Sequence, residues 1–215
     1  MKPGYTLLYV IIFVFLQAIP LYPDNRAAPV VLESAKEEYP IGQNLEILED
    51  TTGSLSFAEV SSPPYSGRFV PSGRDIPNYT FSKSVYWVRF RIAFQQKSMA
   101  DHRDLFIKYE WSNFTSVTAY LPEPGGRCRK SETGVYYPAS SRDVPASSYF
   151  FRLAEQPGEM ATVYLRIQSS GLMIIPLSII TEKKLLSEEG IERTLAGAFF
   201  GIMLIMIFYH LLLYA

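Results

Sequence analysis

Apolar and polar side chains alternate along residues 85–92, whose sequence is V-Y-W-V-R-F-R-I. Successive side chains of a strand point to opposite faces, so the pattern predicts a strand with one face of Tyr, Val, Phe and Ile directed at a core. The other face carries Trp87, Arg89 and Arg91. An indole beside two guanidinium groups is an unusual surface to offer to water, which makes this face a candidate binding surface.

Further strands follow along the chain, separated by turns rich in glycine and proline. A strand, a turn and a short further element are predicted within residues 44–60, and a long surface loop within residues 61–78. The later strands are predicted at residues 105–111, 117–121, 135–137, 149–153, 162–168 and 173–180, the last one broken by Pro176. Because the sequence offers no crossover helices, we predict an all-β fold, an antiparallel β-sandwich or jelly roll.

Two apolar stretches flank the predicted sandwich. The first begins after Lys2 and is shorter than the ~20 residues that span a bilayer, which favours a signal peptide over an uncleaved anchor. The second has no formal charge and is long enough to cross the ~30 Å hydrocarbon core as a helix. The predicted division is a signal peptide at residues 1–23, a linker at 24–42, an extracytoplasmic β-sandwich at 43–181, a charged juxtamembrane connector, helical, at 182–194 and a transmembrane helix at 195–215.

The composition excludes several classes of function. The net charge is −1 and the basic residues are scattered, which argues against nucleic acid as a partner. The two histidines, His102 and His210, supply neither a Ser-His-Asp arrangement nor a multi-histidine metal site in the domain. A glycosidase would need an acid facing Glu110, and the pattern places none there. We therefore predict no enzymatic activity, no metal and no cofactor.

A candidate ligand site emerges if the strands at 85–92 and 162–168 lie in one sheet. Aromatic faces stack on the C–H faces of sugars, while arginine, amide and carboxylate groups bind hydroxyls, and arginine also captures carboxylate or phosphate. These chemistries predict a small extracytoplasmic ligand, specifically a carbohydrate. The candidate residues taken from the pattern are Trp87, Arg89, Glu110, Tyr164, Arg166 and Gln168.

The same side chains also fit a structural interpretation. Trp87 would then pack under a loop, and the arginines would pair with Glu110, Asp50 or Asp101, as charges on sandwich surfaces commonly do. The domain would in that case be a membrane-tethered structural or protein-interaction module without a small-molecule site. A concave sheet with converging candidate side chains favours a ligand, whereas a flat apolar patch favours a protein partner.

Four segments in order resemble the bacterial seven-transmembrane receptors with diverse intracellular signalling modules. The segments are I-L-E-D-T-T-G-S-L-S-F-A-E-V, F-S-K-S-V-Y-W-V-R-F-R-I, T-V-Y-L-R-I-Q-S-S and G-A-F-F-G-I-M-L-I-M-I-F-Y-H-L-L-L-Y. Residues 37–180 resemble the second class of extracellular domain of these receptors, a jelly-roll module that resembles carbohydrate-binding domains. Residues from 195 onward resemble the first of the seven helices. The chain is therefore expected to be the front piece of a longer receptor, or a stand-alone membrane-tethered sensor or decoy module.

The resemblance implies a role in signal transduction at the cell membrane, with the β domain on the periplasmic or extracellular side. Trp87 and Arg89 match the Y-W-x-R-F strand of the family, and Arg166 matches its Y-L-R strand. Arg142 matches an arginine in the loop before a Phe-rich strand and joins the candidate set, whereas a second arginine expected soon afterwards is replaced around Ser147. The expected partners are the ligand, the lipid bilayer and other transmembrane helices, because G-A-F-F-G gives a small-x-x-x-small spacing.

Overall fold

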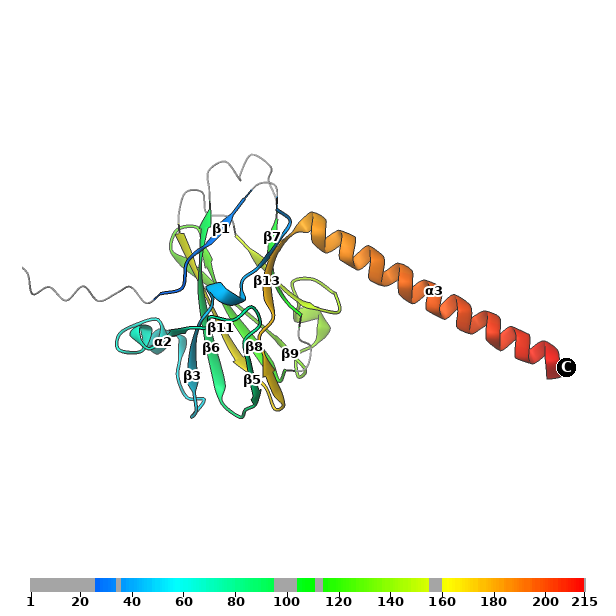
Figure 1. The fold of residues 1–215 in the computed structure, drawn as a ribbon, viewed down its shortest axis with the longest axis horizontal. Coiled ribbons are helices and arrows are strands. Elements are labelled where there is room, and N and C mark those ends of the chain that lie inside the picture. The colour runs from blue at the N-terminus through cyan, green and yellow to red at the C-terminus, as the bar shows by residue number, and fades with distance from the viewer. Residues whose placement is uncertain (1–25, 34–35, 95–103, 111–113, 155–159, 215) are drawn as a thin grey trace, which may run out of the picture.

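Two β-sheets packed face to face, with one long helix projecting from them, make up the computed structural model of the protein (Figure 1). The structure describes residues 26–33, 36–94, 104–110, 114–154 and 160–214. The predicted signal peptide and the start of the predicted linker lie outside these described residues. Within them, the all-β sandwich expected from the sequence is confirmed.

Sheet A contains seven strands in the described part of the chain. Its path is β4 (Val70–Pro71), β3 (Glu46–Asp50), β6 (Val85–Phe94), β11 (Met160–Gln168), β8 (Ser116–Glu123) and β9 (Arg127–Gly134). The seventh strand, β1 (Val30–Leu32), pairs in parallel with the end of β6. One edge of β6 pairs with β11 along residues 85–93, and the opposite edge is shared by β3 and β1.

Sheet B and a short strand pair complete the sandwich. Sheet B has the order β10 (Tyr149–Leu153), β7 (Leu105–Tyr109), β13 (Leu177–Thr181) and β2 (Glu38–Pro40). The separate pair consists of β5 (Asn78–Phe81) and β12 (Leu172–Ile174). The chain passes repeatedly between sheets A and B, from β6 to β7 to β8 and from β9 to β10 to β11, as it does in jelly rolls.

The main core lies between the two sheets and follows the predicted alternation. Val88 and Phe90 of β6 and Leu165 of β11 are fully buried there against Ile107 and Ile179 of sheet B. Along β11 every second residue is buried, so the face assignment made from the sequence is confirmed. Pro176 separates β12 from β13, which confirms the predicted break in the last apolar stretch.

Two local predictions are wrong. The segment 24–42 is not a plain linker, since it contains β1 and β2, each only three residues long and too short to show an alternating pattern. Residues 135–137 form a turn instead of a strand, with Val135 and Tyr136 exposed and Tyr137 half-buried. The strand is β9 just before them, whose sequence R-C-R-K-S-E-T-G is polar because β9 forms one edge of sheet A.

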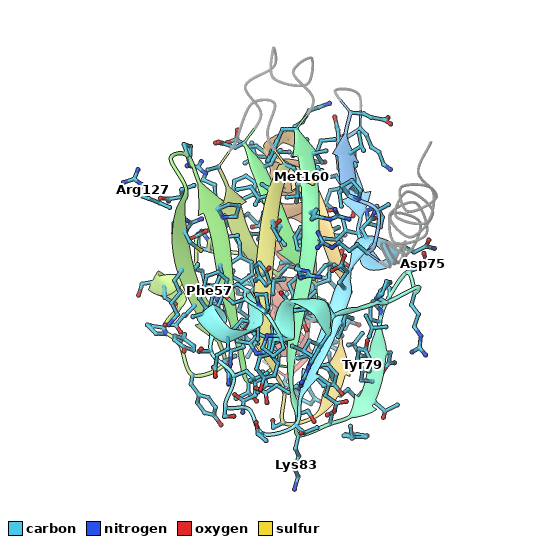
Figure 2. The ribbon with its side chains drawn as sticks, turned by 90° about the vertical axis from the view of Figure 1, so that its left-hand side faces the viewer. Phe57, Asp75, Tyr79, Lys83, Arg127 and Met160 are labelled. Carbon is cyan, nitrogen blue, oxygen red and sulfur yellow. The ribbon has the colours of Figure 1, made fainter. Side chains whose placement is uncertain are left out.

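A short helix and its flanking loops cover the outer face of sheet A. The helix α2 (Phe57–Val60) has a capping box in which the Ser56 side chain accepts from the Glu59 backbone N–H and the Glu59 side chain accepts from the Ser56 backbone N–H. The 3-10 turn η2 (Tyr65–Gly67) follows. Figure 2 shows α2 with Phe57 lying across the strands of sheet A. The predicted strand, turn and short element are thus confirmed, and the short element is helical.

The turn before α2 is held by one carboxylate. Asp50 accepts hydrogen bonds from the backbone N–H groups of Thr52 (3.2 Å), Gly53 (2.9 Å) and Leu55 (2.9 Å), and from the Thr52 hydroxyl (2.8 Å). Burial of this carboxyl raises its pKa, but the hydrogen bonds outweigh burial and hold the pKa below its ordinary value. The ionised form therefore stabilises the cover of sheet A.

Replacing Asp50 with asparagine is expected to lower the free energy of unfolding by about 1–3 kcal/mol at neutral pH, because one acceptor oxygen is lost. Folding lowers the pKa of Asp50 below its unfolded value of ~3.9. The stabilisation of the folded state by ionised Asp50 is therefore present above that unfolded pKa and is lost as the pH falls through the folded pKa. Urea unfolding of both chains between pH 2 and 7 should show a difference that shrinks at the acidic end. Exposed Asp75, changed to asparagine, is the matched control, and a difference that does not vary with pH would contradict the assignment.

The long helix α3 (Glu182–Tyr214) begins directly after β13 and rests on sheet B through its first turns. Leu185 is buried with Phe106 and Phe150, and Lys108 pairs with Glu188 of the helix at 2.9 Å. The prediction that residues 182–194 are helical is confirmed, and the same helix continues without a break to Tyr214. By length and composition α3 can cross a membrane, and the side chains of its apolar part are exposed in the chain alone.

Candidate functional site

The strand register brings several predicted site residues onto one face. In the antiparallel pairing of β6 with β11, Trp87 lies opposite Arg166 and Arg89 lies opposite Tyr164. Gln168, opposite Val85, is half-buried at the end of β11. The condition on which the candidate site depends, that these two strands lie in one sheet and share an outer face, is therefore met.

This face, however, does not offer Trp87 to solvent. The side chain is 0% exposed and belongs to a second apolar cluster with Val60 and Phe69, which come from α2 and the loop after it. Its ring stacks on Tyr120 of β8, with 5.8 Å between the ring centroids. In this arrangement the cover separates the indole from solvent, as in the interpretation in which Trp87 packs under a loop.

Arg89 is held by the same cover. Its Nε donates to the Glu46 carboxylate at 2.7 Å, its Nη2 contacts the same oxygen, and its Nη1 donates to the Ser66 carbonyl at 3.0 Å. The guanidinium also lies 4.3 Å from the centre of the Phe69 ring. Arg89 therefore pairs with an acid of β3 that the sequence pattern did not single out, and it ties the loop over sheet A to the strands beneath.

The other predicted residues separate into two groups. Arg166 donates to the Gly53 carbonyl at 3.1 Å on sheet A, and the Tyr164 ring is held edge-on by Phe57 and Phe69. Glu110 lies after β7 on sheet B, where it pairs with Lys108 at 2.6 Å. Arg142 lies in the loop before β10 and donates to the Ala146 carbonyl and the Tyr149 hydroxyl. The predicted set thus does not converge on a single site.

A small polar cavity lies under the cover of sheet A. We name it the arginine pocket; its volume is about 220 Å³. It includes Arg89 and Tyr164 of the predicted set, and the remaining lining residues were not predicted. The lining consists of Arg26, Glu46, Ser61, Ser66, Arg89, Arg91, Thr162 and Tyr164.

A larger cavity lies where the sandwich meets α3. We name it the junction cleft; its volume is about 590 Å³. Its walls come from β7, β8, β9, β10, the loop before β10 and the first turns of α3. The lining consists of Phe106, Leu121, Pro122, Glu123, Arg129, Asp143, Val144, Arg152, Leu153, Ala154, Glu182, Leu185 and Leu186.

Charged groups of both signs meet on one side of the junction cleft. Arg129 pairs with Asp143 at 3.2 Å and donates to the Arg152 carbonyl at 2.6 Å. The Arg152 side chain pairs with Asp104 at 2.7 Å and lies over the Phe106 ring. None of these residues was predicted, although the predicted Arg142 lies one residue before Asp143. These charged residues follow no regular alternation in the sequence, so no pattern indicates that they share a site.

The residues that the structure describes contain no group of three or more His, Cys, Asp or Glu side chains placed to hold a metal ion. The polar groups of both cavities are arginines, carboxylates and hydroxyls. These are groups that bind small ligands by hydrogen bonds and ion pairs.

A β-sandwich that rests on the first turns of a helix able to span a membrane has the organisation of the extracytoplasmic domain of a membrane protein. Comparison with protein families agrees with this class. The family described as 7TMR-DISM extracellular 2 matches residues 42–181, more than half of the chain, and the chain belongs to this family. The resemblance seen in the sequence is therefore confirmed. A search of curated proteins gave no match.

Proposed function

We propose that the domain is a non-catalytic sensor that binds a carbohydrate outside the cell, and that the junction cleft is the binding site. The observation that carries the proposal is that sandwich residues and the first turns of α3 line the same cavity. The family supports an extracytoplasmic sensing role for the domain, and the chemistry of the cleft supports the class of ligand.

The size and lining of the junction cleft suit a small saccharide. Its volume of about 590 Å³ lies within the range of about 300–1,000 Å³ that holds small ligands. Arg129, Asp143 and Arg152 place donors and acceptors side by side, and a sugar hydroxyl needs both. Val144 and Leu186 leave apolar surface at the cleft that suits the C–H face of a sugar ring. The nearly balanced charge favours a neutral ligand over a strongly charged one.

The position of the cleft gives a route from binding to signalling. A ligand that contacts both the sandwich and α3 binds more tightly to the position of α3 in which both contacts are kept. Only such a difference in affinity can shift the equilibrium between two positions of the helix. The helix is held on the sandwich by the pairs Lys108–Glu188 at 2.9 Å, Lys183–Glu37 at 2.5 Å and Lys184–Glu38 at 3.3 Å, and by the Ser147 hydroxyl, which donates to Glu192 at 2.7 Å. These polar contacts surround the buried Leu185, so a ligand in the cleft lies beside the surface on which the helix docks.

The test uses the full chain in detergent micelles on a broad glycan array, followed by titration of any glycan that binds. We expect Leu186→Trp, which fills the mouth of the cleft, to weaken binding about tenfold or more. Ile191→Trp is the matched control, because Ile191 is similarly exposed on the same helix (58% against 62%) but does not line the cleft.

Unchanged affinity in Leu186→Trp would place the ligand elsewhere. A chain that binds no glycan at all would instead favour the structural or protein-interaction interpretation of the sandwich.

A further inference from the structure

We propose that the arginine pocket binds a single anionic group, a carboxylate, sulfate or phosphate, at Arg91. This site goes beyond the proposed carbohydrate function, because it lies on the outer face of sheet A and shares no lining residue with the junction cleft. The anionic group is either a free inorganic ion or a substituent of a small molecule such as an acidic sugar.

Arg91 brings a positive charge that no described carboxylate neutralises. Its Nη2 donates to the Ala27 carbonyl at 2.7 Å, and its Nε is buried without a hydrogen-bond partner among the described residues. A buried N–H of a cation without an acceptor is unfavourable, and a bound anion would remove that deficit. Arginine presents its donors in a fork that matches the oxygens of carboxylate, sulfate and phosphate.

Glu46 is the one acid among the described residues that line the pocket, and both of its carboxylate oxygens already have partners. One Glu46 oxygen accepts from the Ala27 backbone N–H at 3.0 Å, and the other accepts from Arg89. Glu46 therefore balances Arg89 and leaves the charge of Arg91 to a ligand. Arg89 is a positioning residue, since it holds the Ser66 carbonyl and thereby the loop that closes the pocket.

Hydroxyl groups complete the site. Thr162 is the cross-strand neighbour of Arg91 on β11, and Tyr164 is fixed by the aromatic rings of the cover. Both residues line the pocket, together with Ser61 and Ser66. Hydroxyls donate to anion oxygens at short range, so a cation flanked by hydroxyls is a suitable receptor for an oxyanion.

The volume limits what can enter. At about 220 Å³ the pocket is smaller than the ~300 Å³ at which ordinary ligand clefts begin, so it admits one ionic group and at most a small ring. A long polyanion would need a basic track across the surface, which the scattered basic residues do not supply.

The experiment measures the thermal stability and calorimetric titration of the full chain in detergent at constant ionic strength. Sulfate, phosphate and glucuronate are the probes, with chloride and glucose as references. We expect at least one anion to raise the unfolding temperature saturably while chloride does not, and glucose separates the effect of a neutral sugar in the junction cleft from that of the anionic group. Binding of glucuronate alone assigns the site to a carboxylated sugar, and equal binding of inorganic anions assigns it to a free ion.

Arg91→Gln should weaken anion binding about tenfold or more, because a charge-assisted hydrogen bond is lost. Arg166→Gln is the matched control: Arg166 lies on the same face of sheet A, also donates to a backbone carbonyl, and does not line the pocket. If Arg91→Gln proves unstable, Thr162→Val is used instead. Valine has the shape of threonine, so this variant should fold and should weaken anion binding through the loss of the hydroxyl. The proposal is overturned if no anion stabilises the wild-type chain more than chloride does. It is also overturned if Arg91→Gln binds the anion as tightly as Arg166→Gln does. If Arg91→Gln is unstable, Thr162→Val takes its place in that comparison.

Discussion

Replacing Trp87 with alanine is expected to lower the free energy of unfolding by about 3–5 kcal/mol. The indole is 0% exposed and fills the space between sheet A and its cover, in contact with the cluster of Val60 and Phe69. Truncation would leave a cavity that α2, a helix of four residues, cannot close without losing its own contacts. Urea unfolding of the full chain in detergent, followed by far-ultraviolet circular dichroism of the sheet, measures the change.

Two further variants serve as controls for the stability change of Trp87→Ala. Trp87→Phe retains much of the buried area and should lose less stability than the alanine variant. Tyr136→Ala removes an aromatic side chain that is 83% exposed and should change the stability by less than ~0.5 kcal/mol. If Trp87→Ala unfolds like the wild type yet loses a ligand, the indole contacts that ligand directly and the closed cover is not the state that binds.

The strands that pass through the middle of sheet A could be predicted from the sequence. In β6 and β11 the inner face is apolar at every second position, and burial of that face fixes both the strand and its register. The faces of Trp87, Arg89 and Arg166 followed from this alternation alone. Alternation tells on which side of the strand a side chain lies, but not what covers that side.

The cover depends on contacts between residues distant in sequence, which no local pattern records. Glu46 lies in the sequence E-I-L-E-D and resembles an ordinary outward acid of a strand. It is only 3% exposed, because Arg89, 43 residues later in the chain, and the loop above both close over it. The polar edge strand β9 was missed for a related reason: an edge strand needs only one partner, β8, and no buried face of its own.

The junction cleft also depends on such distant packing. Val144 and Ala146 of the loop before β10 lie against Phe106 and Leu185, so the cavity exists only where this loop, sheet B and α3 meet. The sequence predicts each of these parts separately, but not that they pack together.

The arginine pocket and the junction cleft lie on different faces of the sandwich, and the Glu46–Arg89 pair supports only the arginine pocket. Loss of this pair should therefore affect the cover of sheet A and leave the docking of α3 intact.

Replacing Glu46 with alanine is expected to lower the free energy of unfolding by about 3–5 kcal/mol, because it leaves Arg89 buried without its counter-charge and the Ala27 N–H without its acceptor. The double variant Glu46→Leu/Arg89→Met should lose less stability than the single variants Glu46→Leu and Arg89→Met lose in sum, because apolar side chains can replace a buried ion pair. Urea unfolding of the four chains of this double-mutant cycle measures the coupling. The exposed Lys130–Glu132 pair serves as the control cycle, with a coupling of about 0–1 kcal/mol. Equal couplings in both cycles would show that Glu46 and Arg89 are solvated in solution and that the loop does not close over them.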